Sequence, residues 1–155
     1  MNDMKIGQEF WVCNPWMGWK TNNGLGVWFA LHYGHFKIKK INVKSFIVED
    51  IKEIGCGWSS KWSMDETYTK KFWSKTEMIE TIKVVIPLRI NEMEQIIKQY
   101  TKFAPEYHFG KGKIKFLKEF LELTNDNLSE QDIELFNKKW KKECKKIEKK
   151  ISKLK

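Results

Sequence analysis

Cysteine is scarce in this sequence of 155 residues, and long apolar runs are missing. Cys13, Cys56 and Cys144 are odd in number, widely separated and never spaced as C-x-x-C, which argues against a disulfide framework or a zinc module. Apolar runs such as residues 84–86 fall far short of the about 20 residues that cross a bilayer, and no basic segment leads into an apolar one at the N-terminus. We therefore expect a soluble, cytoplasmic protein with free thiols and no membrane contact.

Arginine is nearly absent, although the protein is strongly basic. The chain holds 29 Lys and Arg residues against 20 Asp and Glu residues, a formal net charge of +9, and Arg89 is its only arginine. Lysine is a flexible point charge, whereas arginine carries the planar fork that reads guanine edges in a bidentate manner. If the protein binds nucleic acid, we expect contacts to phosphates rather than to bases.

Catalytic, metal-binding and cofactor-binding motifs are also lacking. His32 and His35 are three residues apart, so their side chains point to opposite faces of a strand, and the nearby carboxylates of Glu49 and Asp50 are adjacent rather than paired. Residues 110–112, Gly-Lys-Gly, lack the flanking pattern of a phosphate-binding loop. We predict no catalytic residue, no metal site and no cofactor.

The first 90 residues favour strands. Alternating or β-branched runs occupy residues 5–12, 27–33, 36–42, 45–51 and 81–88, and the third and fourth of these form a hairpin. The last run contains Pro87, which lacks a backbone donor and must lie at the end of a strand or on an edge. Residues 13–26 and 55–76 are predicted to be long irregular connections rich in tryptophan.

Hydrophobic spacing becomes helical after Arg89. Asn91 and Glu94 form an N-terminal capping signature for a first helix, a second helix is predicted over residues 113–124, and a third begins after Ser129. The predicted fold class is α+β: an N-terminal β barrel or bent antiparallel sheet followed by three helices, the last long and basic. We divide the chain into a β-rich domain of residues 1–90 and a helical region of residues 91–155 packed on or beside it.

The last predicted helix has an apolar face and a cationic face. Seven apolar side chains fall within about 40° of one direction: Ile133, Phe136, Trp140, Cys144, Ile147, Ile151 and Leu154. The opposite face carries Lys138, Lys142, Lys145, Lys149 and Lys153. Such a row matches the linear phosphate array of a nucleic acid, while the alternative is a lysine face that only keeps the protein soluble.

Two glutamates flank the apolar stripe of this helix. Glu143 and Glu148 lie near the positions that make interchain ion pairs in coiled coils, so a homo-oligomer through this helix is an alternative. Trp140 and Cys144 fit a regular coiled-coil seam poorly. We therefore favour packing against the rest of the chain.

Tryptophan-rich segments and a basic strand are the other candidate contact surfaces. Flat aromatic faces beside lysines can stack bases or anchor a protein partner, or they can cover an open end of the sheet. The tryptophan-rich candidates are Trp16, Trp19, Lys20, Trp58, Lys61 and Trp62. Lys37 and Lys39 form a second cationic row, for which an ordinary solvated sheet face is the alternative.

Residues 4–54 resemble the opening of a small SH3-like barrel. The resemblance rests on the first strand, residues 5–12, and on the later hairpin of residues 34–50. It implies binding to protein or nucleic acid, although ribonuclease toxins of the growth-inhibitor type use a related barrel. This chain lacks their Arg-centred catalytic set. Its size and its lysine bias are similar to those of accessory proteins from phages and plasmids of AT-rich bacteria, including anti-CRISPR-like inhibitors of host defence.

These features rank three hypotheses about function. The first is a non-enzymatic protein that binds an anionic partner, either nucleic acid or a nucleoprotein complex, through the lysine face and the tryptophan-rich segments. The second is a protein inhibitor of a nucleic-acid-handling effector. The third is a barrel-type endoribonuclease.

Overall fold

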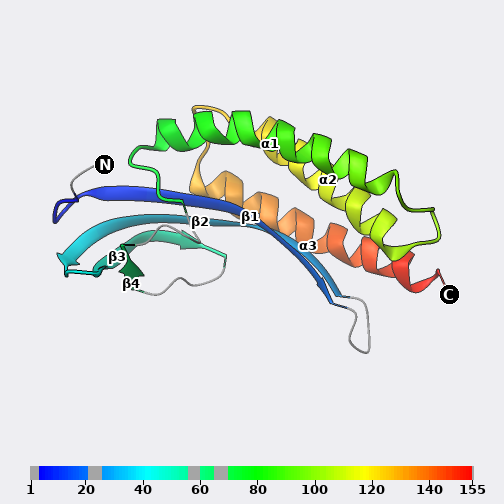
Figure 1. The fold of residues 1–155 in the computed structure, drawn as a ribbon, viewed down its shortest axis with the longest axis horizontal. Coiled ribbons are helices and arrows are strands. Elements are labelled where there is room, and N and C mark those ends of the chain that lie inside the picture. The colour runs from blue at the N-terminus through cyan, green and yellow to red at the C-terminus, as the bar shows by residue number, and fades with distance from the viewer. Residues whose placement is uncertain (1–3, 21–25, 56–59, 65–69, 155) are drawn as a thin grey trace.

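A bent antiparallel sheet is followed by three helices, which confirms the predicted α+β class (Figure 1). The computed structural model describes residues 4–20, 26–55, 60–64 and 70–154. The elements are β1 (Glu9–Lys20), β2 (Gly26–Ile41), β3 (Ser45–Ile54), β4 (Lys61–Ser63), α1 (Lys75–Ile97), α2 (Pro105–Leu123) and α3 (Glu130–Ser152). In this part of the chain no helix has an apolar stretch long enough to cross a membrane.

The four strands pair in chain order, and β2 is longer than β3, which pairs with it on the side opposite β1. β1 pairs with β2 over its whole length, whereas β3 pairs only with the C-terminal half of β2, from Tyr33 to Ile41. Two register shifts interrupt the β2–β3 pairing, and such irregularities bend a sheet. The sheet accordingly curls at the β3–β4 end, while the β1–β2 ribbon extends away from it (Figure 1).

The expected irregular connection at residues 13–26 is wrong for residues 13–20, which belong to β1. Pro15 is compatible with a strand because β1 is an edge strand here. Trp11 bonds outward to Phe72 through its own N–H and C=O, so Pro15, four residues further along, also turns its nitrogen to the outer edge. A proline at such a position removes no ladder hydrogen bond.

The sheet buries opposite faces in its two halves. Alternate side chains of β2, from Val27 to Tyr33, join the core under the helices, whereas Phe36 and Ile38 point to the other face. There they pack inside the curl with Phe10, Val12, Phe46, Val48 and Trp62. Gly34 lies at the changeover, where a Cβ would stand 2.2 Å from the Phe36 ring. β2 therefore serves two cores, and the predicted strands 27–33 and 36–42 are one strand.

Helix α1 corrects the predicted strand over residues 81–88 and contains the expected domain boundary. Ser74 begins the helix, because its hydroxyl accepts the N–H of Glu77 at 3.1 Å. A buried row at helical spacing then outweighs the β propensity of the Val-Val-Ile run. The row consists of Met78, Ile79, Ile82, Ile86 and Ile90. Asn91 is consequently interior to α1 rather than a cap.

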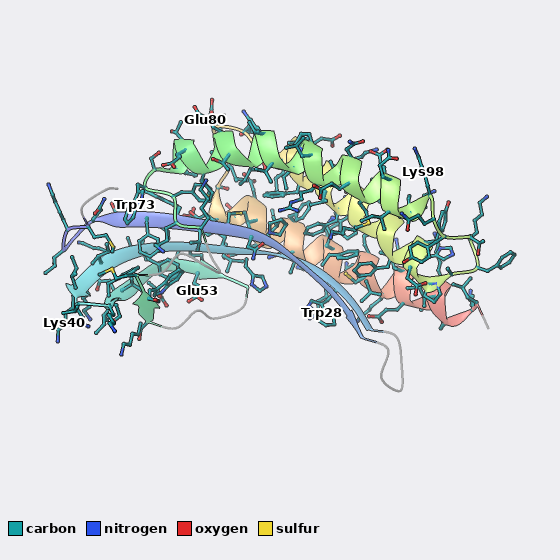
Figure 2. The ribbon with its side chains drawn as sticks, in the orientation of Figure 1. Trp28, Lys40, Glu53, Trp73, Glu80 and Lys98 are labelled. Atoms are coloured by element: carbon teal, nitrogen blue, oxygen red, sulfur yellow. The ribbon has the colours of Figure 1, made fainter. Side chains whose placement is uncertain are left out.

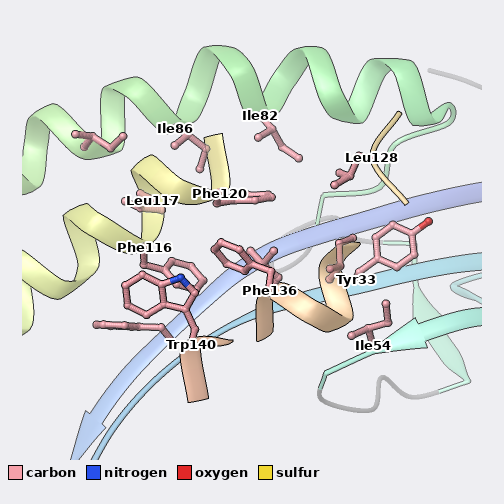
Figure 3. Close-up of a cluster of buried hydrophobic side chains, with 14 of the residues drawn as sticks. Tyr33, Ile54, Ile82, Ile86, Phe116, Leu117, Phe120, Leu128, Phe136 and Trp140 are labelled. Atoms are coloured by element: carbon pink, nitrogen blue, oxygen red, sulfur yellow. The ribbon is translucent and has the colours of Figure 1, made fainter. Parts of the chain in front are cut away.

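Helix α2 begins eight residues before its predicted start. Gly110 and Gly112 do not interrupt this helix but lie where it packs closely against its neighbours. A Cβ on Gly110 would lie 2.2 Å from Ile97 of α1, and a Cβ on Gly112 would lie 2.5 Å from Ile147 of α3. Because neither glycine carries a side chain, α2 can approach both α1 and α3 closely. The resulting core is rich in aromatic residues, including Phe116, Phe120, Phe136 and Trp140 (Figure 3).

Candidate functional site

Side chains of α3 bind the backbone of β2 where no described strand covers its edge. Val27, Phe29 and Leu31 turn their backbone groups away from β1, and each N–H finds an acceptor on α3. The acceptors are Glu148 Oε1 for Val27 (2.7 Å), Cys144 Sγ for Phe29 (3.0 Å) and Asn137 Oδ1 for Leu31 (2.7 Å). The helix thereby replaces the missing strand and satisfies donors that would otherwise be left open.

Asn137 makes a second hydrogen bond to β2, and the Cys144 thiol is kept in its neutral form. Asn137 also donates from Nδ2 to the Leu31 carbonyl at 2.9 Å, so its amide side chain closes both groups of one residue. Burial raises the pKa of the Cys144 thiol, which stays neutral and accepts the Phe29 N–H. Cys144 is thus a packing residue with a defined hydrogen bond.

The opposite flank of α3 faces α2 and forms ion pairs there. Lys139 pairs with Glu119 of α2, and Lys115 of α2 lies 3.7 Å from Glu143. Glu143 also pairs with Lys146 at 3.3 Å. Glu143 and Glu148, considered as interchain partners in the sequence, therefore bond within the chain.

The remaining face of α3 is the predicted lysine row. We call its five members the lysine ridge: Lys138, Lys142, Lys145, Lys149 and Lys153. All five are exposed, and among the described residues none of them takes part in an ion pair. With a rise of about 1.5 Å per residue, the ridge extends for about 22 Å along one rigid helix. The buried stripe, the strand-binding flank and the α2-facing flank together hold this face toward solvent.

A groove opens between the lysine ridge and the sheet edge. It has a volume of about 550 Å³ and lies between α3, which supplies Lys141 and Lys145, and residues 27–30 of β2. Trp28, which was not among the predicted contact residues, lines the groove and lies at the far end of β2 from Lys40 (Figure 2). Glu134 and Glu148 also line the groove, so charges of both signs border it. An aromatic ring near cationic side chains is the kind of surface on which bases stack.

The other predicted contact residues do not gather at this surface. Trp62 is a correction: it is only 9% exposed and packs in the core inside the curl, so it is not a contact residue. Lys37 is exposed but stands opposite Glu9 and Glu49 on the neighbouring strands, which offset its charge. Lys39 and Lys61 are exposed as well, at the curled end of the sheet.

The tryptophan-rich candidates fall mostly outside what the structure describes. Trp16, Trp19 and Lys20 are placed in β1 through their backbone pairing with β2, and their side chains are not described. Trp58 lies outside the described residues.

His32, His35 and Cys13 are titratable side chains of β1 and β2 that could take part in acid–base chemistry. His35 stacks on Trp11 with ring centroids 4.3 Å apart and lies 3.1 Å from Glu9. Burial lowers the pKa of His32 and raises the pKa of the Cys13 thiol to about 12, so both groups are neutral at pH 7. In the described part of the chain no three His, Cys, Asp or Glu side chains gather in a way that could hold a metal ion.

No protein-family model matches the chain, and neither a curated protein nor a solved structure matches it.

Proposed function

We propose that the protein binds nucleic acid without cleaving it, through contacts between the lysine ridge and the phosphate backbone. The observation that supports this proposal is the set of five exposed lysines, free of ion pairs in the described structure, on a helix whose rotation is fixed by its own hydrogen bonds to β2. Lysines that only solubilise a helix need no such fixed alignment. The groove beside Trp28 offers a place for an unpaired base next to the phosphates.

The charge of the ridge predicts the character of the binding. Displacement of counterions by the lysines gives a logarithmic salt dependence with a slope of about 0.7 to 0.9 per phosphate contact. With a single arginine in the chain, bidentate reading of guanine has little support, so base sequence should matter less than salt.

Two variants with the same net charge test the proposal. The ridge variant replaces Lys138, Lys142, Lys145 and Lys149 by Gln, and the control variant replaces four exposed lysines elsewhere, Lys40, Lys44, Lys83 and Lys102, by Gln. Fluorescence anisotropy with a single-stranded and a duplex 20-nucleotide probe is measured over a series of salt concentrations.

We expect the ridge variant to lose affinity for all probe sequences alike, and its salt slope to flatten by up to about 3 units. The control variant should keep the slope of the parent, and the probes should be recovered intact. Equal losses in the two variants would show that binding follows net charge alone and would refute the ridge as the site.

A nucleic-acid-handling protein is the second candidate partner. Val84 and Leu88 of α1 are 66% and 60% exposed, and apolar side chains on an outer helix face suit a protein partner. If the parent binds neither probe, this candidate takes the place of the first. It predicts that a partner captured from nuclease-treated lysate is lost on exchange of Val84 and Leu88 for Ser.

A further inference from the structure

A second cavity lies at the other edge of the β1–β2 ribbon, between β1, α1 and α2. Its volume is about 490 Å³, within the range of sites that hold small molecules. Most of its wall is apolar: Phe72 comes from the segment that bridges to β1, and Ile82, Val85 and Ile86 come from α1. Leu117 of α2 closes the far side.

Among the described residues, three cations and no carboxylate line this cavity. They are Lys70, Arg89 and Lys113, from the segment before α1, from α1 and from α2. Lys70 stands 5.3 Å above the Phe72 ring. Arg89 forms an ion pair with Glu92 at 3.4 Å, and both side chains are more than 60% exposed. Such an exposed pair is weak, and most donors of the guanidinium remain available.

Lys113 is a cation whose charged form is disfavoured by its surroundings in this cavity. It is partly buried, and burial, together with the positive charge of Arg89, lowers the pKa of its ammonium group. The negative charge of Glu92 offsets these two effects only in part, and Lys113 takes part in no ion pair in the described structure. An anion placed between Lys113 and Arg89 would relieve both effects, because it replaces lost hydration and separates two like charges.

The remaining polar groups suit binding rather than catalysis. Cys13 lines the cavity, but burial raises its thiol pKa to about 12, so it offers no thiolate nucleophile at neutral pH. Asn14 and Thr81 add neutral hydrogen-bonding groups.

We propose that this cavity binds a small organic acid with an apolar body, such as a medium-chain carboxylate. Its carboxylate lies between Arg89 and Lys113, with Lys70 at the rim. Its apolar body rests on Phe72, Ile82 and Val85. This site is independent of the lysine ridge and does not depend on the proposed nucleic-acid binding.

Calorimetric titration of the full chain with decanoate, below its micelle concentration, tests the proposal. We expect saturable binding of one decanoate per chain, binding of decanol at least tenfold weaker, and a loss of roughly fourfold for each methylene removed from the acid. Arg89→Gln and Lys113→Met should each weaken decanoate at least tenfold. Lys118→Gln, an exposed lysine of α2 outside the cavity, should bind as the parent does.

Further readouts separate the cavity from general electrostatic attraction. The ridge variant should retain its affinity for decanoate, and Lys113→Met should melt above the parent in the absence of ligand, because it removes a partly desolvated charge. Arg89 is largely exposed, so its substitution reports on binding even if the Lys113 variant fails to fold. Equal affinities for decanoate and decanol, full affinity in the Arg89 variant, loss of decanoate binding in the ridge variant, or no saturable binding would each overturn the proposal.

Discussion

Replacement of Asn137 by Leu is the most direct test of how α3 is held on the sheet. The Asn137 side chain accepts the Leu31 N–H at 2.7 Å and donates to the Leu31 carbonyl at 2.9 Å, and Leu31 is fully buried. A leucine of similar size removes both bonds. It leaves two backbone groups without their partner at a strand edge that no described strand covers.

The magnitude follows from those two groups. Each buried polar group left unsatisfied costs about 1–3 kcal/mol. Asn137 borders the groove beside Trp28, from which water can reach part of the edge, so the lower part of that range applies to each group. The expected loss is about 2–4 kcal/mol in the free energy of unfolding. In a domain of this size that lowers Tm by roughly 4–16 °C.

Urea unfolding and native-state hydrogen exchange measure this effect. The Leu31 amide should exchange faster in Asn137→Leu than the global loss of stability explains, because its opening becomes local. Gln131→Leu, an exposed amide residue in the first turn of the same helix, is the matched control and should change stability by less than about 0.5 kcal/mol. A loss in Asn137→Leu no larger than that of the control, with unchanged protection at Leu31, would refute the edge-sealing role.

Two further substitutions probe the sheet. Gly34→Ala should destabilise by roughly 1–3 kcal/mol in urea unfolding, since its Cβ would lie 2.2 Å from the Phe36 ring. Gly26→Ala, whose Cβ would meet no atom of the described residues within 4 Å, should be nearly neutral, and equal effects of the two substitutions would contradict the close approach at Gly34. Tyr33→Phe removes the 3.0 Å bond to Glu130 and should cost about 1 kcal/mol at pH 7. Burial opposes ionisation of Glu130, but hydrogen bonds from its own N–H and from Tyr33 outweigh it and lower the carboxyl pKa, so this stabilisation is present above the unfolded pKa of about 4.3 and is lost as pH falls through the lower folded value. The difference between parent and variant should therefore narrow below pH 4, and a difference independent of pH would contradict this account.

The last helix could be predicted from the sequence because every local signal agreed. Ser129 caps it and Asp132 completes a reciprocal capping box. Five residues of the predicted apolar stripe are buried, and the five lysines opposite are exposed. A long amphipathic helix needs little tertiary information, since its period defines both faces.

The first helix was predicted to begin at Asn91, whereas α1 begins at Lys75, because two signals conflicted before that point. The run of residues 84–86 has high β propensity, and Pro87 suggested the end of a strand. The signals that decide the matter are the Ser74 and Glu77 capping pair and the isoleucines at 79, 82, 86 and 90, which continue the helical period backwards. The β propensity of residues 84–86 does not decide the structure here, because burial of the isoleucine row contributes more free energy than the conformational preference of those three residues.

The two cavities could not be predicted because each is assembled across the chain. Lys70, Arg89 and Lys113 are separated by 19 and 24 positions, and only the packing of α1 on α2 and β1 gathers them. The role of Asn137 is equally non-local, since its partner Leu31 is 106 positions away. Nothing in the local pattern of α3 distinguishes Asn137 from a solvated polar residue.

The sealing of β2 and the exposure of the lysine ridge are consequences of the same hydrogen bonds. If α3 rotated to turn its lysines inward, Glu148, Cys144 and Asn137 would leave the N–H groups of three strand residues without acceptors. Those donors and the buried stripe both oppose such a rotation. A ligand that binds the ridge therefore meets charges already in position, so it spends little free energy on ordering the backbone of the protein. Substitutions at Asn137 should consequently weaken binding along with stability, because Asn137 holds α3 on the sheet as well as bordering the groove. Substitutions on the ridge should weaken binding alone.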